Sequence, residues 1–585
     1  MRNKIFTFLT GIFLLLFLIN ISSAQEQEII PIPQEWDGSA FGVINRFIHN
    51  DTTATGERKH PNCIYQLERG GYYDVNSPLS IDYDITIAAA PDNPNTDTDD
   101  APPMISRGTD GQGNYISGLF VLRGDSSNLT FKGIMLNGAQ DDNQIVNRGS
   151  SLFGSISGIH HRVVFDGCVF SGWGGNILNS RDCDGSTWIF TNNIFRNGVD
   201  LDNPWGGNIY SVITTSAHQD TIRFVNNTFF NYASYQFLSW DFVDYIEYDH
   251  NTLFVSTLNA HWINYLTNAK FTNNIFFNYQ TVGQTTYEIG NGHWDKDGIS
   301  GNQPSSICKL SLVDPQRLFD HGLTEADRMV NYSNNVYYWT DELKTYWATH
   351  KDSSQGVELD ILPITFMNDH TDSMFKSLGD YDYPNFIAND NVELDPEFDA
   401  ALVTDVMAKE MPFVKNYRRY GVGALVDPKE RFYAPDGIFW DLIWTWPLPE
   451  DLTYTNSDVL THAEGGFPAG DLNWYPDKKA QWEEWVTSVE NNENKIGPNE
   501  YTLSQNYPNP FNPTTEINFS IPVAAKTSLI VYNVLGQKVA TILNQKLAAG
   551  TYKYRFDAAD LASGLYFYKL QSRKYLEVKK MMLIK

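Results

Sequence analysis

The hexapeptide Phe190-Thr-Asn-Asn-Ile-Phe195 is the clearest copy of a pattern that recurs along the middle of the chain. Each copy begins and ends with an apolar residue and carries asparagine at its fourth position. The other copies are Phe224-Val-Asn-Asn-Thr-Phe229, Tyr248-Asp-His-Asn-Thr-Leu253, Phe271-Thr-Asn-Asn-Ile-Phe276 and Tyr332-Ser-Asn-Asn-Val-Tyr337. Counted from degenerate copies at Phe131 and Phe165 as far as Phe271, the steps are 34, 25, 34, 24 and 23 residues. Periods of about 20 to 50 residues indicate a solenoid.

A second column of residues advances together with the first, so the repeated unit is structural. Its members are Ile145-Val-Asn147, Ile177-Leu-Asn179, Ile209-Tyr-Ser211, Phe237-Leu-Ser239 and Trp262-Ile-Asn264, with Glu288-Ile-Gly290 as a degenerate sixth copy. Each unit contains short runs of β-branched and aromatic residues at period two, broken by Asn-Gly and Gly-Gly. No helical spacing extends over ten or more residues. The pattern therefore predicts strands and disfavours leucine-rich and helical repeats.

The repeat resembles the right-handed parallel β-helix of pectate-lyase-like proteins, with one coil per repeat and variable loops at the corners. The resemblance implies that one asparagine from each coil stacks on the next as an amide ladder. The ladder residues would be Asn193, Asn227, Asn251, Asn274 and Asn335. We expect these side chains to be structural rather than catalytic, because every coil supplies the same one.

The C-terminal segment holds four motifs in a fixed order. They are Asn506-Tyr-Pro-Asn-Pro-Phe-Asn-Pro-Thr-Thr515, Ile530-Val-Tyr-Asn-Val-Leu-Gly-Gln-Lys-Val539, Leu561-Ala-Ser-Gly-Leu-Tyr-Phe567 and the terminal Lys-Lys-Met-Met-Leu-Ile-Lys. Alternating apolar runs between Gly, Asn and Pro turns predict a small Ig-like β-sandwich. From about residue 501 the segment resembles the C-terminal sorting domain of type IX secretion. The resemblance implies export across the outer membrane, with the type IX machinery as a partner.

At the N-terminus, Arg2 and Lys4 precede an apolar run over residues 5–19, which predicts a secretory signal peptide. The run is shorter than the roughly 20 residues that span a bilayer, so we expect no transmembrane anchor. The predicted fold class is all-β, a right-handed parallel β-helix solenoid followed by a small Ig-like β-sandwich. The expected order is a signal peptide (1–24), the parallel β-helix (25–340), an irregular aromatic-rich cap or side layer (341–490), a linker (491–498) and the sorting domain (499–585).

Charge and cysteine content narrow the range of partners. Residues 498–585 carry 11 Lys and Arg against 5 Asp and Glu, whereas the whole chain has a net charge of −28, so the acidity lies in the body. Such a surface repels nucleic acid phosphates, and we expect no nucleic acid partner. The chain has 4 cysteines, and outside the cell disulfides persist. Cys168 and Cys183 are the nearest pair in sequence and the favoured disulfide among three possible pairings.

The candidate site follows the second column, where stacked strands would present side chains in register. The candidate catalytic residues are Arg181, Asp241 and His261. Arg181 would neutralise a uronate carboxylate, and His261 or His293 would abstract a proton, since imidazole titrates near the working pH. The candidate substrate-binding residues are Trp240, Tyr265, His293 and Trp294, whose rings suit sugar faces. The alternative is that the aromatic side chains pack under corner loops and that the charged groups are solvated.

Calcium is the one cofactor that the sequence suggests. Asp295 and Asp297 stand close together, as ligands of Ca²⁺ do, but they match a calcium-loop motif only in part. A plain turn is the alternative at this position.

Three functions fit this sequence, and none is marked by a familiar catalytic motif. The first is a secreted or outer-membrane cell-surface β-helix protein that binds extracellular polysaccharide. The second is a polysaccharide lyase or glycoside hydrolase that acts on an acidic glycan. The third is a structural or self-associating surface element, which the acidic charge and the expected cap disfavour.

Overall fold

The computed structural model describes most of the chain between residues 27 and 585. The described ranges are 27–34, 42–91, 101–110, 112–138, 151–173, 177–180, 182–198, 209–212, 218–233, 235–259, 261–263, 265–292, 301–321, 323–378, 383–421, 446–492, 501–522, 525–547, 550–573 and 575–585. No helix in these ranges is long and apolar enough to cross a membrane.

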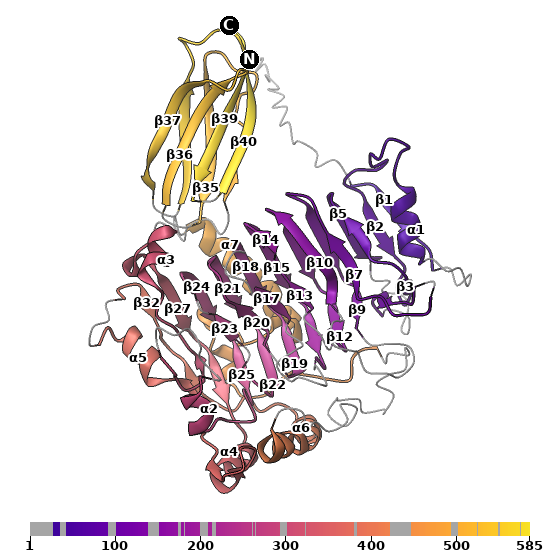
Figure 1. Cartoon of the computed structure of the whole chain (residues 1–585), viewed down its shortest axis with the longest axis vertical. Helices are drawn as coiled ribbons and strands as arrows, with labels where there is room; N and C mark the ends of the chain where they lie inside the picture. Colours follow the sequence, from indigo (N-terminus) through magenta and orange to yellow (C-terminus); the bar gives the residue numbers. More distant parts are fainter. Residues whose placement is uncertain are drawn as a thin grey trace, which may run out of the picture.

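One face of the body is an 11-stranded parallel sheet that runs along the whole solenoid (Figure 1). Its strands in spatial order are β1 (Ile29–Ile32), β2 (Ile64–Leu67), β5 (Ile85–Ala89), β8 (Asn128–Lys132), β11 (Arg162–Asp166), β15 (Ser186–Thr191), β18 (Gln219–Val225), β21 (Val243–Asp249), β24 (Asn268–Thr272), β27 (Met329–Ser333) and β32 (Phe386–Ile387). Neighbours in this sheet are one coil apart in sequence. The chain therefore winds as a parallel β-helix, as the repeats predict.

The second long face is a 10-stranded parallel sheet. Its strands are β3 (Tyr72–Val75), β6 (Met104–Arg107), β9 (Met135–Asn137), β12 (Val169–Ser171), β16 (Ile194–Arg196), β19 (Thr228–Tyr232), β22 (Thr252–Ser256), β25 (Ile275–Phe277), β28 (Val336–Tyr338) and β33 (Val392–Glu393). The last strands of both long sheets lie after residue 383, so a coil continues beyond residue 340. Segments inserted between β28 and β32 separate this last coil from the repeat in the sequence.

The remaining strands of the coils form two shorter parallel sheets. The first contains β4 (Leu79–Ile81), β7 (Gly118–Leu122), β10 (Ser151–Ile159) and β14 (Asp182–Asp184). The second contains β13 (Leu178–Asn179), β17 (Tyr210–Val212), β20 (Phe237–Ser239) and β23 (His261–Ile263). This second sheet is the column on which the sequence places the candidate site.

The expected amide ladder is present at the turn between the two long sheets. Each ladder asparagine donates from Nδ2 to Oδ1 of the asparagine in the next coil, as Asn227 does to Asn251 at 2.9 Å and Asn335 does to Asn391 at 2.8 Å. The residue before each ladder asparagine adopts a left-handed backbone, for example Asn226 at φ 54° and Asn273 at φ 61°. Asparagine tolerates this conformation better than most residues, which explains why the repeat carries two in succession.

Aromatic stacks fill the interior of the coils. Phe131, Phe165, Phe190 and Phe224 stack in one column with centroid distances of 4.9, 5.5 and 4.4 Å. All four are fully buried. Because each coil places the same ring over the one before, apolar area is removed from water along the entire solenoid.

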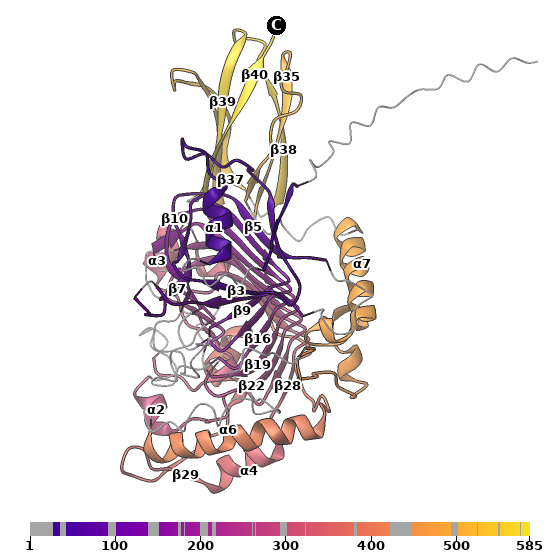
Figure 2. The same ribbon diagram turned by 90° about the vertical axis from the view of Figure 1, so that its right-hand side faces the viewer.

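Helices and small sheets lie around the coils. The helices are α1 (Val43–Asn50), α2 (Thr286–Gly290), α3 (Pro315–Asp320), α4 (Asp341–Thr349), α5 (Asp369–Phe375), α6 (Ala400–Tyr420) and α7 (Pro476–Asn492). Two-stranded sheets join β26 (Ser306–Cys308) to β31 (Thr365–Met367), and β29 (Lys351–Asp352) to β30 (Leu359–Asp360). Figure 2 shows α4 and α6 beneath the last coils and α7 beside the sheets.

A strap over residues 464–475 lies across the coils. The Gly470 N–H donates to the carbonyl of Asn273 at 2.7 Å, and the Asp471 N–H donates to Oγ1 of Thr252 at 2.8 Å. Gly470 has φ 78°, and a Cβ at this position would lie 2.4 Å from Oγ1 of Thr252. Glycine is therefore required where the strap comes closest to the sheet.

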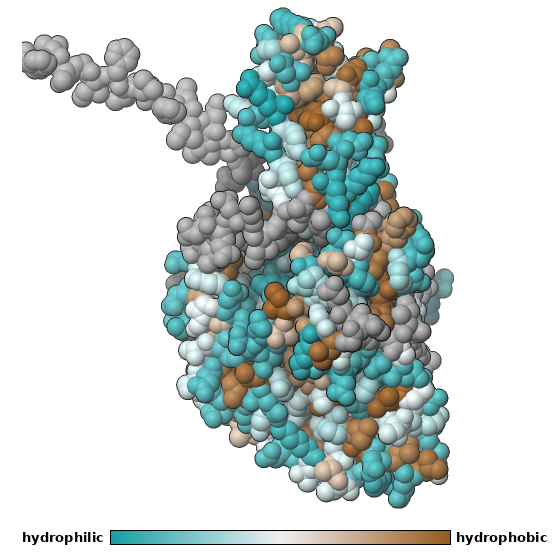
Figure 3. Space-filling model, turned by 90° about the vertical axis from the view of Figure 1, so that its left-hand side faces the viewer, coloured by the Kyte–Doolittle hydropathy of each residue, from teal (hydrophilic) through white to brown (hydrophobic). Residues whose placement is uncertain are grey.

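The C-terminal part is an antiparallel sandwich with its own hydrophobic core. One sheet contains β34 (Thr502–Leu503), β35 (Thr514–Ile521) and β38 (Gly550–Asp557), and the other contains β37 (Lys538–Leu547), β36 (Ala525–Asn533), β39 (Gly564–Ser572) and β40 (Tyr575–Leu583). Figure 3 shows it as a separate lobe above the body.

The favoured disulfide is absent. Cys63, Cys168, Cys183 and Cys308 are all free and buried. Cys168 instead donates to the carbonyl of Phe131 inside the solenoid, at an Sγ–O distance of 3.4 Å, and Sγ of Cys183 lies 2.8 Å from Oγ of Ser186. Proximity in sequence misled the prediction, because the two thiols occupy different sites within the coils.

Candidate functional site

Among the nominated residues that the structure describes, Asp241 and Tyr265 share a contact with Arg317, whereas His261 lies apart from them. Asp241 is 2 % exposed, and its Oδ1 accepts from Nη2 of Arg317 and from the backbone N–H of Phe242, both at 2.8 Å. This carboxylate is therefore paired beneath α3. Its described contacts share no residue with those of His261.

His261 points into the core rather than out of it. It lies in register with Phe237 of the preceding coil, and its ring packs edge-on against Tyr248, Phe271 and Phe276. Burial lowers the pKa of His261 to about 3, so the imidazole stays neutral at ordinary pH. The expected outward orientation is wrong, because the alternation of side chains along β23 turns this residue inward.

Two nominated aromatic residues, Trp240 and Tyr265, lie within the described residues. Trp240 is 37 % exposed, the most accessible of the nominated side chains that the structure describes. The Tyr265 ring stacks on Phe242 at a centroid distance of 5.1 Å, and the Arg317 guanidinium lies 4.0 Å from its centroid. The contacts of Tyr265 thus match the alternative in which aromatic side chains pack against neighbouring segments.

Five nominated residues lie outside the described residues. They are Arg181, His293, Trp294, Asp295 and Asp297. The proposed calcium ligands and the group for a uronate carboxylate are therefore among the residues whose surroundings the structure does not define.

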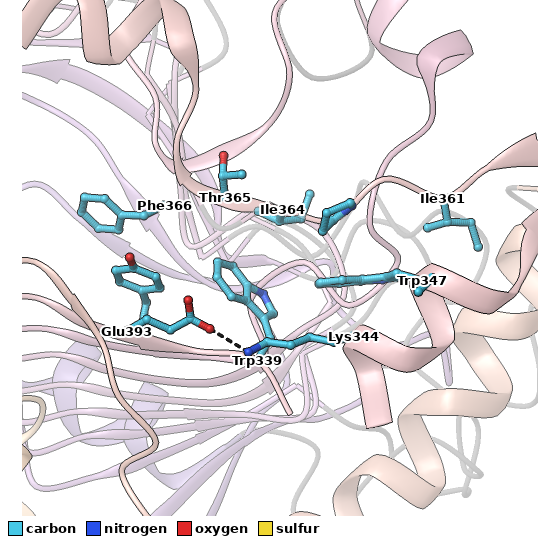
Figure 4. A pocket seen from close by; sticks show the side chains of 11 residues that line it. Trp339, Lys344, Trp347, Ile361, Ile364, Thr365, Phe366 and Glu393 are labelled. Atoms are coloured by element: carbon cyan, nitrogen blue, oxygen red, sulfur yellow. Dashed lines mark hydrogen bonds and ion pairs between the residues drawn. The ribbon is translucent and has the colours of Figure 1, made fainter. Parts of the chain in front are cut away.

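The structure presents a different candidate site at the C-terminal end of the solenoid. A pocket of about 490 Å³ opens between β28, α4 and the segment that leads into β31 (Figure 4). Its lining includes Tyr337, Trp339, Lys344, Trp347, Ile361, Ile364, Phe366 and Glu393. A volume of this size and a mainly apolar lining with a few polar groups are typical of ligand sites.

Aromatic rings make up much of the pocket wall. Tyr337 and Phe366 stack at a centroid distance of 4.9 Å and an interplanar angle of 19°, and both are half-buried. Trp339 and Trp347 pack edge-on at 6.4 Å, and their indole N–H groups donate to the carbonyls of Tyr279 and Thr281 at 2.8 and 2.9 Å. These bonds fix the positions of both indoles on the last coils.

One ion pair lies beside the aromatic wall. Nζ of Lys344 is 2.7 Å from Oε1 of Glu393, and the two side chains are 40 and 46 % exposed. Burial and the nearby Glu393 carboxylate raise the pKa of Tyr337, which keeps its hydroxyl protonated. The pocket thus offers apolar faces together with a hydroxyl, an ammonium group and a carboxylate that water can reach.

Sequence reasoning missed this pocket because its residues do not repeat. Tyr337 ends the last copy of the hexapeptide, but its partner Phe366 comes from an insertion and Glu393 from the coil beyond it. The only signal was local. The aromatic run Tyr337-Tyr-Trp339 stands directly before Thr340, which precedes the first residue of α4.

The C-terminal sandwich carries the strongest link to known proteins. Its two antiparallel sheets and the motifs from Asn506 to the terminal lysine coincide with a family model that matches residues 505–585. This segment is a secretion system C-terminal sorting domain. The sorting domain directs the protein into type IX secretion, so the chain is secreted or displayed at the cell surface. No curated protein matches the chain at a significant level.

Proposed function

We propose that this exported protein binds an extracellular polysaccharide at the pocket formed by β28, α4 and β31. The observation that carries the proposal is the wall of Tyr337, Trp339, Trp347 and Phe366 beside the exposed Lys344–Glu393 pair. The sorting domain supports it by bringing the protein to the compartment where such polymers are found.

The chemistry of the wall suits a sugar ring. The C–H faces of a pyranose are apolar, and half-buried aromatic rings such as Tyr337 and Phe366 supply flat surfaces for them. Hydroxyl groups on the rim of the sugar need donors and acceptors, which Lys344 and Glu393 supply. Because this ion pair is exposed, little free energy is lost when its groups turn to a ligand.

Binding to a panel of neutral and acidic polysaccharides tests the proposal. Affinity electrophoresis and calorimetry with the purified chain should identify at least one ligand. Phe366→Ala and Lys344→Gln should each weaken its binding about tenfold, which corresponds to about 1.4 kcal/mol. Tyr420→Ala serves as a control, because Tyr420 is a 55 % exposed aromatic residue that does not line the pocket.

Absence of binding to every polymer, or binding that Phe366→Ala leaves unchanged, would contradict the proposal. New reducing ends and unsaturated-uronate absorbance are followed in the same samples. Product that forms with the wild type and is lost in Phe366→Ala would make the pocket catalytic rather than a binding site only.

A further inference from the structure

A second cluster of functional groups lies where the body meets the sorting domain. His218 directly precedes β18, Asp220 lies within it, and Asp244 lies on the neighbouring β21. One imidazole nitrogen and one oxygen from each carboxylate lie within 4.8 Å of one another. The three residues are between 1 and 9 % exposed.

The coils bring these residues together. Gln219 pairs with Val243, and Thr221 pairs with Tyr245, so the acidic residue between each pair of partners occupies the same position in successive coils. Adjacent parallel strands are about 4.8 Å apart, which is close enough for two carboxylates to share one cation. The cluster is thus a direct product of the β-helix register.

The cluster carries acidic groups that need a positive partner. Asp220 and Asp244 are only 9 and 1 % exposed, so water has little access to either carboxylate. Nε2 of His218 lies 3.1 Å from Oδ1 of Asp244, and Nδ1 of His218 lies 3.8 Å from Asp184.

The positive partner is supplied by the sorting domain. Arg573 follows β39, its side chain is 7 % exposed, and its Nη1 donates to Oδ1 of Asp244. The second oxygen of Asp244, Oδ2, is buried and makes no hydrogen bond within the described residues. A charged oxygen in such a place is costly unless a cation or donor reaches it.

A cavity reaches His218, one of the three residues of the cluster. It has a volume of about 800 Å³ and lies between α3 and the sorting domain, with His218, His321, Lys546 and Arg573 in its lining. A small ion can therefore approach His218 without opening the solenoid.

We propose that His218, Asp220 and Asp244 form a site for a divalent transition-metal ion of the Zn²⁺ or Mn²⁺ kind, which Arg573 of the sorting domain covers. One imidazole and two carboxylates are a donor set that these ions accept. Calcium is disfavoured, because it takes six to eight oxygen ligands.

Competition for one carboxylate follows from this arrangement. The guanidinium and the metal ion both need Asp244, so each weakens the binding of the other. Docking of the sorting domain therefore masks the site, and its removal exposes a negative, partly preformed set of ligands.

The full-length chain tests this inference through Arg573→Gln, which removes the positive charge and leaves the three ligands in place. Calorimetry with ZnCl₂ and with MnCl₂ should give one site per chain in this variant, at least tenfold tighter than in the wild type. Lys546→Gln is the matched control, because Lys546 lines the same cavity but pairs with Asp327 instead. It should bind the metals as the wild type does.

Loss of the ligands in the Arg573→Gln background decides whether the cluster is the site. Asp244→Asn and, separately, His218→Gln should each lower the affinity at least tenfold, with circular dichroism to confirm folding. If Asp244→Asn does not fold, His218→Gln decides. Bound Co²⁺ should also lose part of its visible absorption in His218→Gln. The inference would be overturned if Arg573→Gln bound Zn²⁺ and Mn²⁺ no more tightly than the wild type does. It would also be overturned if the ligand substitutions left the metal affinity unchanged, or if Ca²⁺ bound as tightly as Zn²⁺.

Discussion

The coils of the β-helix and the region that follows them share one hydrophobic core, yet different polar contacts hold them together. In the coils, the same amide bond recurs at the same turn, from Asn193 to Asn391. The region after residue 340 instead has buried ion pairs that occur only once in the fold. Arg418, for example, pairs with Asp352 and with Glu288 of α2. Repetition leaves a visible pattern in the sequence, whereas a pair that occurs once leaves none.

Loss of a single-copy charge should have the largest effect. Nη1 of Arg418 lies 3.0 Å from Oε2 of Glu288 and 2.8 Å from Oδ2 of Asp352, and Arg418 is 1 % exposed. Arg418→Ala leaves two buried carboxylates unpaired and should lower the free energy of unfolding by about 3–5 kcal/mol. Urea unfolding measures this loss. The exposed neighbour Arg419 is the control, and equal effects of Arg418→Ala and Arg419→Ala would refute the contrast.

Loss of one ladder residue should cost less. Oδ1 of Asn251 accepts from the backbone N–H and from Nδ2 of Asn227, at 3.0 and 2.9 Å. Asn251→Ala leaves these buried donors unsatisfied, so we expect a loss of about 1–3 kcal/mol. Asn391 ends the ladder and is half-buried, so water can replace it. Asn391→Ala should therefore cost less than about 1 kcal/mol. If urea unfolding showed a larger loss for Asn391→Ala than for Asn251→Ala, position at the end of the ladder would not set the cost.

Asp471 in the strap should make the free energy of unfolding depend on pH. Burial raises the pKa of Asp471 from 3.8 to about 7, against opposing hydrogen bonds from Asn473 and Thr228. Because the folded-state pKa is higher than the unfolded value of 3.8, protonation of Asp471 stabilises the folded state. This contribution to the free energy of unfolding is complete below pH 3.8 and is lost as the pH rises to about 7. The slope is at most about 1.4 kcal/mol per pH unit. Thermal unfolding of Asp471→Asn between pH 4 and 7 should lack this slope. A slope equal to that of the wild type would assign the effect elsewhere.

The smallest effect should come from an ion pair that is also single-copy but exposed. Lys344 and Glu393 lie beside the aromatic pocket at 40 and 46 % exposure. Lys344→Gln should change the free energy of unfolding by less than about 1 kcal/mol, because water screens the pair. Comparing the unfolding free energies of Lys344→Gln and Arg418→Ala in urea separates the effect of burial from the effect of losing a charge. A loss as large as that of Arg418→Ala would show that burial does not set the scale.

The contrast between repetition and single occurrence also explains what the sequence could predict. The β-helix, the ladder and the sorting domain follow from recurrent or ordered motifs, and all three are present. Asn391 escaped notice because the insertion after β28 separates it by 56 residues from Asn335. The pairing of the cysteines was mispredicted because distance along the chain does not measure distance between coils.

The candidate site was harder to predict than the fold. Strand alternation decides whether a side chain faces the core, and in short strands a shift of one residue reverses the result. His261 was placed on the wrong face for this reason. The aromatic pocket depends on Phe366 and Glu393, which only the folded chain brings to Tyr337. No local pattern connects residues that come from an insertion, a helix and two successive coils.

The four buried thiols make this fold independent of oxidation. Burial raises the pKa of Cys168 and Cys183 to about 12, so neither is a reactive thiolate at neutral pH. The exported protein can therefore fold without a thiol oxidase or a disulfide isomerase. Reducing agents leave its native contacts intact. Only an unfolded chain exposes these sulfur atoms to an oxidising medium. Folding itself therefore protects the four thiols from oxidation.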